Sequence, residues 1–159
     1  MSLNDWLLAL HLLSGFALTA AIVLFWVAIV AIRRTDRPEQ VVAAARLLPV
    51  GSVVVIVGSL GVVIFGIWLA IALDGVEVWN GWVIAAIILW AVGTETGRRS
   101  DPEFAPCVNR AKELVAAGQT EPDARLAELA RTQKGLLLHT IATVAILLIL
   151  VDMIWKPGA

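Results

Sequence analysis

The sequence predicts an all-α integral membrane protein, a four-helix bundle with a helical cytoplasmic loop between the third and fourth spans. Three observations carry this prediction. Hydrophobic residues make up 60% of the 159 residues and charged residues 16%, against about 45–50% and about 25% in soluble domains. The apolar residues form four long stretches, and the basic residues lie between them. A chain this short has too little interior to hide so much apolar surface from water.

The four predicted spans are residues 6–32, 47–73, 79–96 and 136–155, within one transmembrane domain that covers residues 1–159. A helix needs about 20 mostly apolar residues to cross the hydrocarbon core. The first stretch has no basic leading segment and is about twice as long as the apolar core of a signal peptide, so we interpret it as a span. None of the four alternates polar and apolar residues as barrel strands do.

The basic residues predict the orientation. Eleven of the twelve Lys and Arg residues lie in the loop after the first span or in the loop after the third, and Lys156 is the twelfth. The positive-inside rule therefore places both loops in the cytoplasm and both termini on the non-cytoplasmic side of the cell (inner) membrane. Five tryptophans near the outer boundary are expected to form an aromatic belt: Trp6, Trp68, Trp79, Trp82 and Trp155.

The cytoplasmic loop, residues 97–135, is expected to hold two further helices. One is predicted to begin anew at Pro106 and to run to Ala117, with Gly118 as its stop. The other starts near Asp123 and could continue directly into the fourth span. The loop also contains Cys107, which we interpret as an ordinary loop residue. A lone cysteine excludes an intrachain disulfide.

The second span is rich in small residues, which mark close helix contacts in lipid. We therefore expect this helix to be the central packing element of the bundle. Gly61 and Gly66 lie near the level of His11 on the first span, where they would make room for a ligand.

Two histidines are the candidate site residues, since ionisable groups within a membrane are costly and often functional. His11 lies about one turn below the outer boundary and His139 about one turn above the inner boundary. Because the first and fourth helices are antiparallel, the two should be roughly 20 Å apart along the membrane normal. One haem iron cannot be held by both. Each histidine could bind haem or copper with other ligands, or could hydrogen-bond to a neighbouring helix. Asp152 could pair with Lys156, four residues on.

Three functional hypotheses remain. The first is a non-catalytic accessory or homo-oligomeric membrane protein, whose partners are the lipid bilayer, a second copy or a membrane complex. The second is a haem- or copper-binding membrane protein that uses His11. The third is a small proton- or ion-coupled transporter, against which the lack of a carboxylate near the midplane counts. The sequence offers no nucleophile constellation and no basic-aromatic surface for nucleic acid.

Several short segments resemble a known family. Leu10-His11-Leu12-Leu13, Phe65-Gly66-Ile67-Trp68-Leu69 and Met153-Ile154-Trp155-Lys156-Pro157-Gly158 are similar to segments of an uncharacterised bacterial family of predicted four-helix integral membrane proteins. More distantly, the Leu-His start resembles copper-resistance D-type proteins and four-helix haem-binding protoporphyrinogen oxidases, which implies that His11 is a haem ligand. The Trp-x-Gly-Gly pattern of those proteins is replaced here by residues 17–21, so the resemblance does not extend to the oxidase activity.

Overall fold

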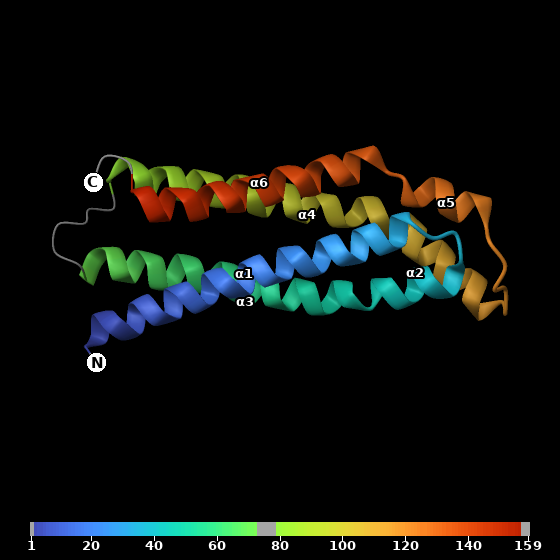
Figure 1. Cartoon of the computed structure of the whole chain (residues 1–159), viewed down its shortest axis with the longest axis horizontal. Helices are drawn as coiled ribbons and strands as arrows, with labels where there is room; N and C mark the ends of the chain where they lie inside the picture. Colours follow the sequence, from blue (N-terminus) through green and yellow to red (C-terminus); the bar gives the residue numbers. More distant parts are fainter. Residues whose placement is uncertain (1, 73–78, 157–159) are drawn as a thin grey trace.

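A computed structural model describes residues 2–72 and 79–156, and within these ranges the chain forms helices and no strand (Figure 1). This confirms the all-α prediction. The helices are α1 (Leu3–Arg33), α2 (Pro38–Ala45), α3 (Leu47–Ala72), α4 (Gly81–Ala116), α5 (Ala124–Ala130) and α6 (Gln133–Trp155).

In the described part of the chain, three stretches are long and apolar enough to cross a membrane: Leu3–Arg33, Pro38–Ala72 and Ala124–Trp155. Each contributes exposed large aliphatic side chains, which would be unfavourable in water and suit a lipid environment. The predicted third span is not among them, because the apolar part of α4 ends at Gly93, shortly before Glu95 and Arg98.

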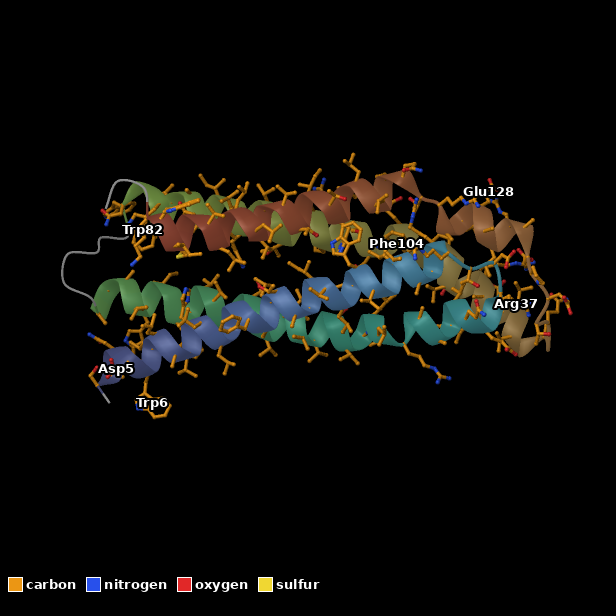
Figure 2. All side chains as sticks on the ribbon, viewed as in Figure 1. Asp5, Trp6, Arg37, Trp82, Phe104 and Glu128 are labelled. Carbon is orange, nitrogen blue, oxygen red and sulfur yellow. The ribbon has the colours of Figure 1, made fainter. Side chains whose placement is uncertain are left out.

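The long helices form two pairs. In one, α1 packs along α3; in the other, α4 packs along α6 (Figure 1). The first residues of α1 and the last of α6 lie at the same end of the molecule. Figure 2 shows Trp6 and Trp82 near that end and Arg37 and Glu128 at the opposite end, where α2 and α5 lie. We call the first end the open end and the second the cap.

Glycine allows the close approach of α1 to α3. A Cβ at Gly58 would lie 2.9 Å from the backbone nitrogen of Leu18 and 3.0 Å from the carbonyl oxygen of Ser14. At Gly61 it would collide with the Ser14 side chain. Such contacts supply the packing that holds helices together in lipid. The expectation that this helix is central was wrong: its main partner is α1, because its glycines face that helix.

In the second pair, α6 crosses α4 closely near the cap. A Cβ at Gly135 would lie 2.9 Å from the Phe104 ring. The carbonyl of Gly135 accepts a hydrogen bond of 2.9 Å from the Ser100 hydroxyl, which is buried. Further along, Gly93 faces Ala145 at ordinary van der Waals distance. Small residues therefore set this crossing as well.

Outside the cap, the two pairs meet at few places. The Trp26 indole N–H donates to the Thr143 hydroxyl over 2.8 Å, and the Trp90 indole N–H donates to the Ser59 hydroxyl over 2.8 Å. Between these bonds lies a small apolar cluster built on Leu18, Ile146 and Ile149. The pairs are otherwise joined chiefly at the cap.

The cap has a hydrophobic core of its own, to which the end of α1, α2, the second half of α4 and α5 all contribute. Its buried members are Ile32, Val41, Ala45, Cys107, Val108, Ala111, Leu126 and Ala130. Cys107 is fully buried, so its interpretation as an ordinary loop residue was wrong: it lies on the inner face of α4. Burial raises the pKa of the Cys107 thiol to about 11, which keeps it protonated and unreactive near neutral pH.

The helix predicted to begin at Pro106 does not begin there. Instead α4 runs without a break from Gly81 to Ala116, with Pro102 and Pro106 inside it. A proline within a helix costs about 3 kcal/mol because it removes a hydrogen bond and crowds the preceding turn. The same turns bury Phe104 and Cys107, which offsets that cost.

The expected continuation of α5 into the fourth span is interrupted. Asp123 caps α5 by accepting a 2.7 Å hydrogen bond from the Leu126 N–H, and this bond, together with Arg110, lowers the pKa of the Asp123 carboxyl. The helix then ends at Ala130, and α6 starts after Thr132, whose hydroxyl accepts from the Gly135 N–H. Arg33 bridges the break, since its guanidinium donates to the carbonyls of Ala130 and Thr132.

Replacement of Gly58 by alanine should destabilise the α1–α3 pair, because the new methyl group meets backbone atoms that cannot move aside. Overpacking of this kind costs about 1–3 kcal/mol. A loss of 1 kcal/mol lowers the thermal midpoint of a chain of this size by about 2–4 °C. The measurement is thermal unfolding in mild detergent.

Gly15→Ala is the matched control, since a Cβ at Gly15 meets nothing within 4 Å. This variant should keep or slightly raise the midpoint, because alanine favours the helix by up to about 1 kcal/mol. Equal midpoints for the two variants would contradict the glycine contact as the basis of the pair.

Candidate ligand-binding cavity

A cavity of about 300 Å³ lies between the two helix pairs, toward the open end. All four long helices contribute to its wall: α1 with His11, α3 with Gly66, α4 with Trp90 and α6 with Met153. Lys156, which directly follows α6, also lines it. Its volume is at the lower end of the range of about 300–1,000 Å³ that is typical of small-molecule sites. Among the described residues that line it, His11 and Lys156 are the ionisable ones. The rest of the wall is largely aliphatic and aromatic.

His11 is fixed by the neighbouring helix. Its Nδ1 lies 3.1 Å from the carbonyl oxygen of Val62 on α3. Because a carbonyl can only accept, Nδ1 must carry the hydrogen, and in the neutral ring Nε2 keeps its lone pair. The same arrangement orients histidines that bind metals through the second ring nitrogen.

Gly66 makes room for the imidazole of His11. A Cβ at Gly66 would lie 2.9 Å from Cε1 and 3.1 Å from Nδ1 of His11. The glycine therefore accommodates the ring directly, whereas Gly61 is occupied by the contact with Ser14. The sequence-based expectation that both glycines leave space for a ligand holds for Gly66, which lines the cavity, and fails for Gly61. The free volume lies instead between the helix pairs.

Trp82 forms part of the cavity wall near the start of α4. Its side chain is 8% exposed, whereas Trp6, Trp68, Trp79 and Trp155 are all at least half exposed. Those four fit the expected aromatic belt and Trp82 does not, because it turns inward. Its indole N–H is buried and has no hydrogen-bond partner within the described part of the chain.

Lys156 lies over Trp82, with Nζ 5.5 Å from the ring centroid. Such a cation–π contact is worth about 0.5–1 kcal/mol at an exposed site. The predicted ion pair between Lys156 and Asp152 is absent from the ion pairs of the described residues; instead, the Lys156 N–H donates to the Asp152 backbone carbonyl over 2.8 Å. The left-handed conformation of Lys156 (φ 42°) ends α6. This geometry turns its side chain toward α4.

His139 occupies a different part of the bundle, toward the cap. It is buried, with its ring centroid 4.9 Å from that of Trp26 and 6.0 Å from that of Phe25. Trp26 follows His11 by fifteen residues on α1, which corresponds to about 22 Å along the helix. The two histidines therefore belong to separate surroundings. His139 Nε2 has no partner among the described residues, and His139 lines neither cavity described here.

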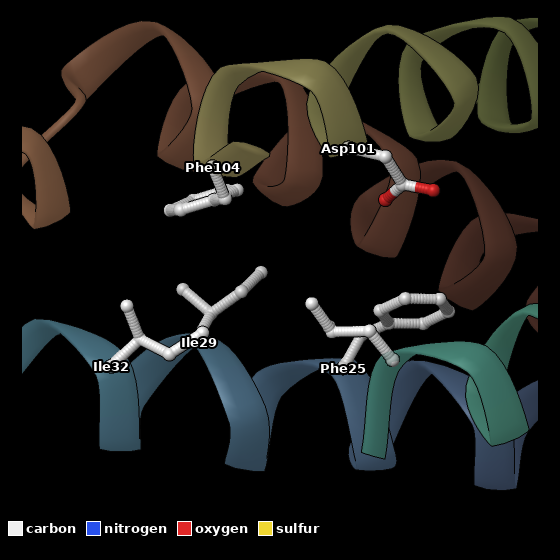
Figure 3. A pocket seen from close by; sticks show the side chains of 6 residues that line it. Phe25, Ile29, Ile32, Asp101 and Phe104 are labelled. Carbon is white, nitrogen blue, oxygen red and sulfur yellow. The ribbon is translucent and has the colours of Figure 1, made fainter. Parts of the chain in front are cut away.

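A second, smaller cavity lies near the cap (Figure 3). Its volume is about 100 Å³, and in the close-up Phe25, Ile29 and Ile32 of α1 face Asp101 and Phe104 of α4 across it. Because liquid water occupies about 30 Å³ per molecule, it would hold a few waters. A cofactor would not fit.

A preformed multidentate metal centre is absent from the described residues, which bring no three His, Cys, Asp or Glu side chains together. A metal ion at His11 would need a different second ligand. The thioether of Met153 lines the same cavity and is a soft ligand suited to copper(I).

No family model, curated protein or solved structure matches the chain. The resemblance drawn from short apolar motifs therefore stays a prediction. The site is therefore defined by its geometry alone, and sequence reasoning anticipated two residues of its wall, His11 and Gly66. The inward turn of Trp82 and the roles of Trp90 and Met153 had no signal in the sequence, since each is also typical of lipid-facing or core positions.

Proposed function

We propose that this chain is a non-catalytic, four-span protein of the cell (inner) membrane that binds a small, largely apolar ligand in the cavity around His11. The cavity between the two helix pairs is the observation that carries the proposal. Its wall is apolar, a few polar groups converge on it, and it lies where helices of a bundle commonly hold ligands.

The packing of α4 against α6 supports a fourth span. The apolar first part of α4 runs beside α6, which is itself long and apolar enough to cross a membrane. The cap carries nearly all the basic residues, so it is the cytoplasmic side by the positive-inside rule. The termini then lie outside. The lipid bilayer covers the exposed aliphatic side chains, and a second copy or a membrane complex would use the same faces.

Cysteine accessibility tests this topology. In a Cys107→Ala background, Ser2→Cys and Ala117→Cys each place one exposed thiol at opposite ends of the molecule. A membrane-impermeant maleimide applied to spheroplasts should label Ser2→Cys directly and Ala117→Cys only after permeabilisation. The reverse pattern would invert the orientation, and labelling of both before permeabilisation would show that an even number of spans separates them.

The residues that line the cavity favour ligand binding over transport and catalysis. The cavity has no carboxylate among its described lining residues, and Asp152 lies outside the wall. A proton- or ion-coupled carrier depends on such a group along its path. His11 has its Nδ1–H held by Val62, which suits a fixed ligand contact.

Filling the cavity should abolish ligand binding. Ala86 is 6% exposed and lines the wall, so Ala86→Phe places a ring in the free volume. A dodecan-1-ol probe that bears a diazirine near its chain end, incorporated into lipid nanodiscs, should label α4 and α6 saturably in the native protein. Saturable labelling should fall about tenfold or more in Ala86→Phe, which corresponds to a loss of about 1.4 kcal/mol.

The matched control is Ala91→Phe, the same substitution at an exposed position of α4 outside the cavity wall. It should leave the labelling unchanged. Resistance of native Cys107 to maleimide verifies that both variants are folded. Equal labelling of the two variants, or labelling that never saturates, would refute the cavity as a ligand site.

A second candidate, copper or haem binding at His11, is favoured by one observation. The hydrogen bond to Val62 leaves Nε2 of His11 available as a ligand, and Met153 lines the same cavity. Imidazole and thioether together suit copper(I), and the same two groups are axial ligands in cytochromes. The size of the cavity favours a single metal ion.

The visible absorption spectrum and the metal content of the purified protein test copper or haem binding at His11. Protein purified in mild detergent from cells supplied with haem and copper should show a Soret band or stoichiometric copper if His11 is a ligand. The signal should disappear in His11→Ala and persist in His139→Ala, which removes the other histidine at a distance. A colourless, metal-free preparation would reject the candidate and leave the apolar-ligand proposal standing.

A further inference from the structure

The charged and polar groups at the open end do not select a charged ligand. The indole N–H of Trp82 and the Oδ2 atom of Asp152 are buried without hydrogen-bond partners among the described residues, so neither has surface to offer a ligand. Lys156 is exposed, and its ammonium lies over the Trp82 ring. Asp152 lies in the last turn of α6 and Lys156 directly follows that helix. A carboxyl group and an ammonium group thus share this end, which favours neither sign of charge.

His11 presents a hydrogen-bond acceptor to the cavity. The Val62 carbonyl holds its Nδ1–H over 3.1 Å. Nε2 makes no hydrogen bond within the described part of the chain, yet it is not one of the buried atoms that lack a partner there, so it keeps accessible surface. The described lining residues include no carboxylate that would compensate an imidazolium, and an uncompensated charge is costly in apolar surroundings. The ring is therefore neutral, and Nε2 carries a free lone pair.

The depth of His11 favours an uncharged ligand. Trp6, an exposed member of the predicted aromatic belt, precedes His11 by five residues on α1, which corresponds to about 7.5 Å along the helix. In the proposed topology the imidazole thus lies below the interfacial level of the tryptophans and the charged head groups. An ionised group would lose its hydration at this depth, whereas a hydroxyl exchanges its hydration for one hydrogen bond.

The rest of the cavity suits a hydrocarbon chain. On α4 the lining extends from Trp82 to Trp90, and eight helical residues span about 12 Å. Liquid water takes about 30 Å³ per molecule, and a methylene group is of similar size, so a cavity of about 300 Å³ holds on the order of ten chain carbons. One chain fits this space and the two chains of a phospholipid do not.

From this geometry we infer that the cavity binds an uncharged, single-chain lipid with a terminal hydroxyl, of the long-chain alcohol type. The O–H donates to Nε2 of His11, and the chain extends between the helix pairs toward Trp90. This inference rests on the proposed function and specifies the chemical class of the ligand. It requires no covalent step, and a metal ion on Nε2 would exclude it.

Two isomeric probes isolate the hydroxyl donor. Dodecan-1-ol and undecyl methyl ether contain the same atoms, and only the alcohol can donate a hydrogen bond. Each carries a diazirine near the far end of its chain and is titrated into lipid nanodiscs, and half-saturation is read from the labelled α4 and α6 peptides. The alcohol should bind about fivefold more tightly than the ether, since one hydrogen bond contributes about 1 kcal/mol net.

Two variants assign the preference to the imidazole. His11→Phe keeps an aromatic ring beside Gly66 and removes the acceptor, so it should bind the two probes equally. Met153→Leu changes another residue of the cavity wall at nearly constant volume, and it should keep the preference for the alcohol. Resistance of native Cys107 to maleimide verifies that both variants are folded.

Nitrogen NMR of the native protein supplies a readout that needs no variant. The chain has two histidines, so isotope-labelled histidine gives few signals. The alcohol should shift the resonance of the unprotonated Nε2 of His11, because that atom becomes a hydrogen-bond acceptor. The ether should leave this resonance in place, and neither probe should move the signals of His139.

Equal binding of alcohol and ether by the native protein, a preference that survives His11→Phe, or an unmoved His11 resonance would overturn the inference. In each case saturable labelling by the ether would still uphold the cavity as an apolar site. Absence of saturable labelling by both probes would overturn the proposed function as well. Displacement of the alcohol by a diacylglycerol and not by a monoacylglycerol would show that the occupant has two chains, and would exclude the single-chain ligand.

Discussion

Close backbone contact between helices is the constraint on which this structure depends. Lipid chains are as apolar as leucine, so helices inside a bilayer gain little from burying aliphatic side chains against each other and must instead pack tightly. Gly58 on α3 and Gly135 on α6 provide that tight packing, each with neighbouring atoms about 3 Å from the position of a Cβ. These glycines make their close contacts within each pair, not between the two pairs. Trp26 and Trp90 bridge the two pairs through their indole N–H groups, and Trp90 also lines the cavity between the pairs.

The cap is stabilised by a different interaction, the hydrophobic effect, because it lies beyond the apolar stretches. Ile32, Val41 and Leu126 are fully buried there, and burial from water stabilises such side chains by about 1.5–3 kcal/mol each. The cap therefore holds the two pairs together at one end through the hydrophobic effect. At the open end no comparable core exists among the described residues. Among the described residues, the two pairs are therefore packed together most firmly at the cap, and the cavity lies toward the opposite end.

The sequence predicted the helical class and three segments that are long and apolar enough to cross a membrane, because long uncharged stretches such as residues 6–32 are typical of membrane spans. It failed where tertiary contacts outweigh a local signal. Pro106 is a helix start by local rules, yet α4 passes through it because Phe104 and Cys107 are buried on the same turns. It also failed where the direction of a side chain matters. Trp82 and Trp79 are both boundary tryptophans by position, and only the packing distinguishes the buried ring from the exposed one.

The length of α4 has a mechanical consequence. The helix runs unbroken over 36 residues from the cavity wall to the cap, a rod of about 54 Å. Near its first residues it forms the wall at Trp82, and in its second half it contributes Cys107 and Ala111 to the cap core. Because the second half of α4 is packed into the cap, a displacement of its first residues acts on the cap contacts. A ligand that widens the gap at Trp82 would tilt α4 about the cap and strain its contacts with α2 and α5.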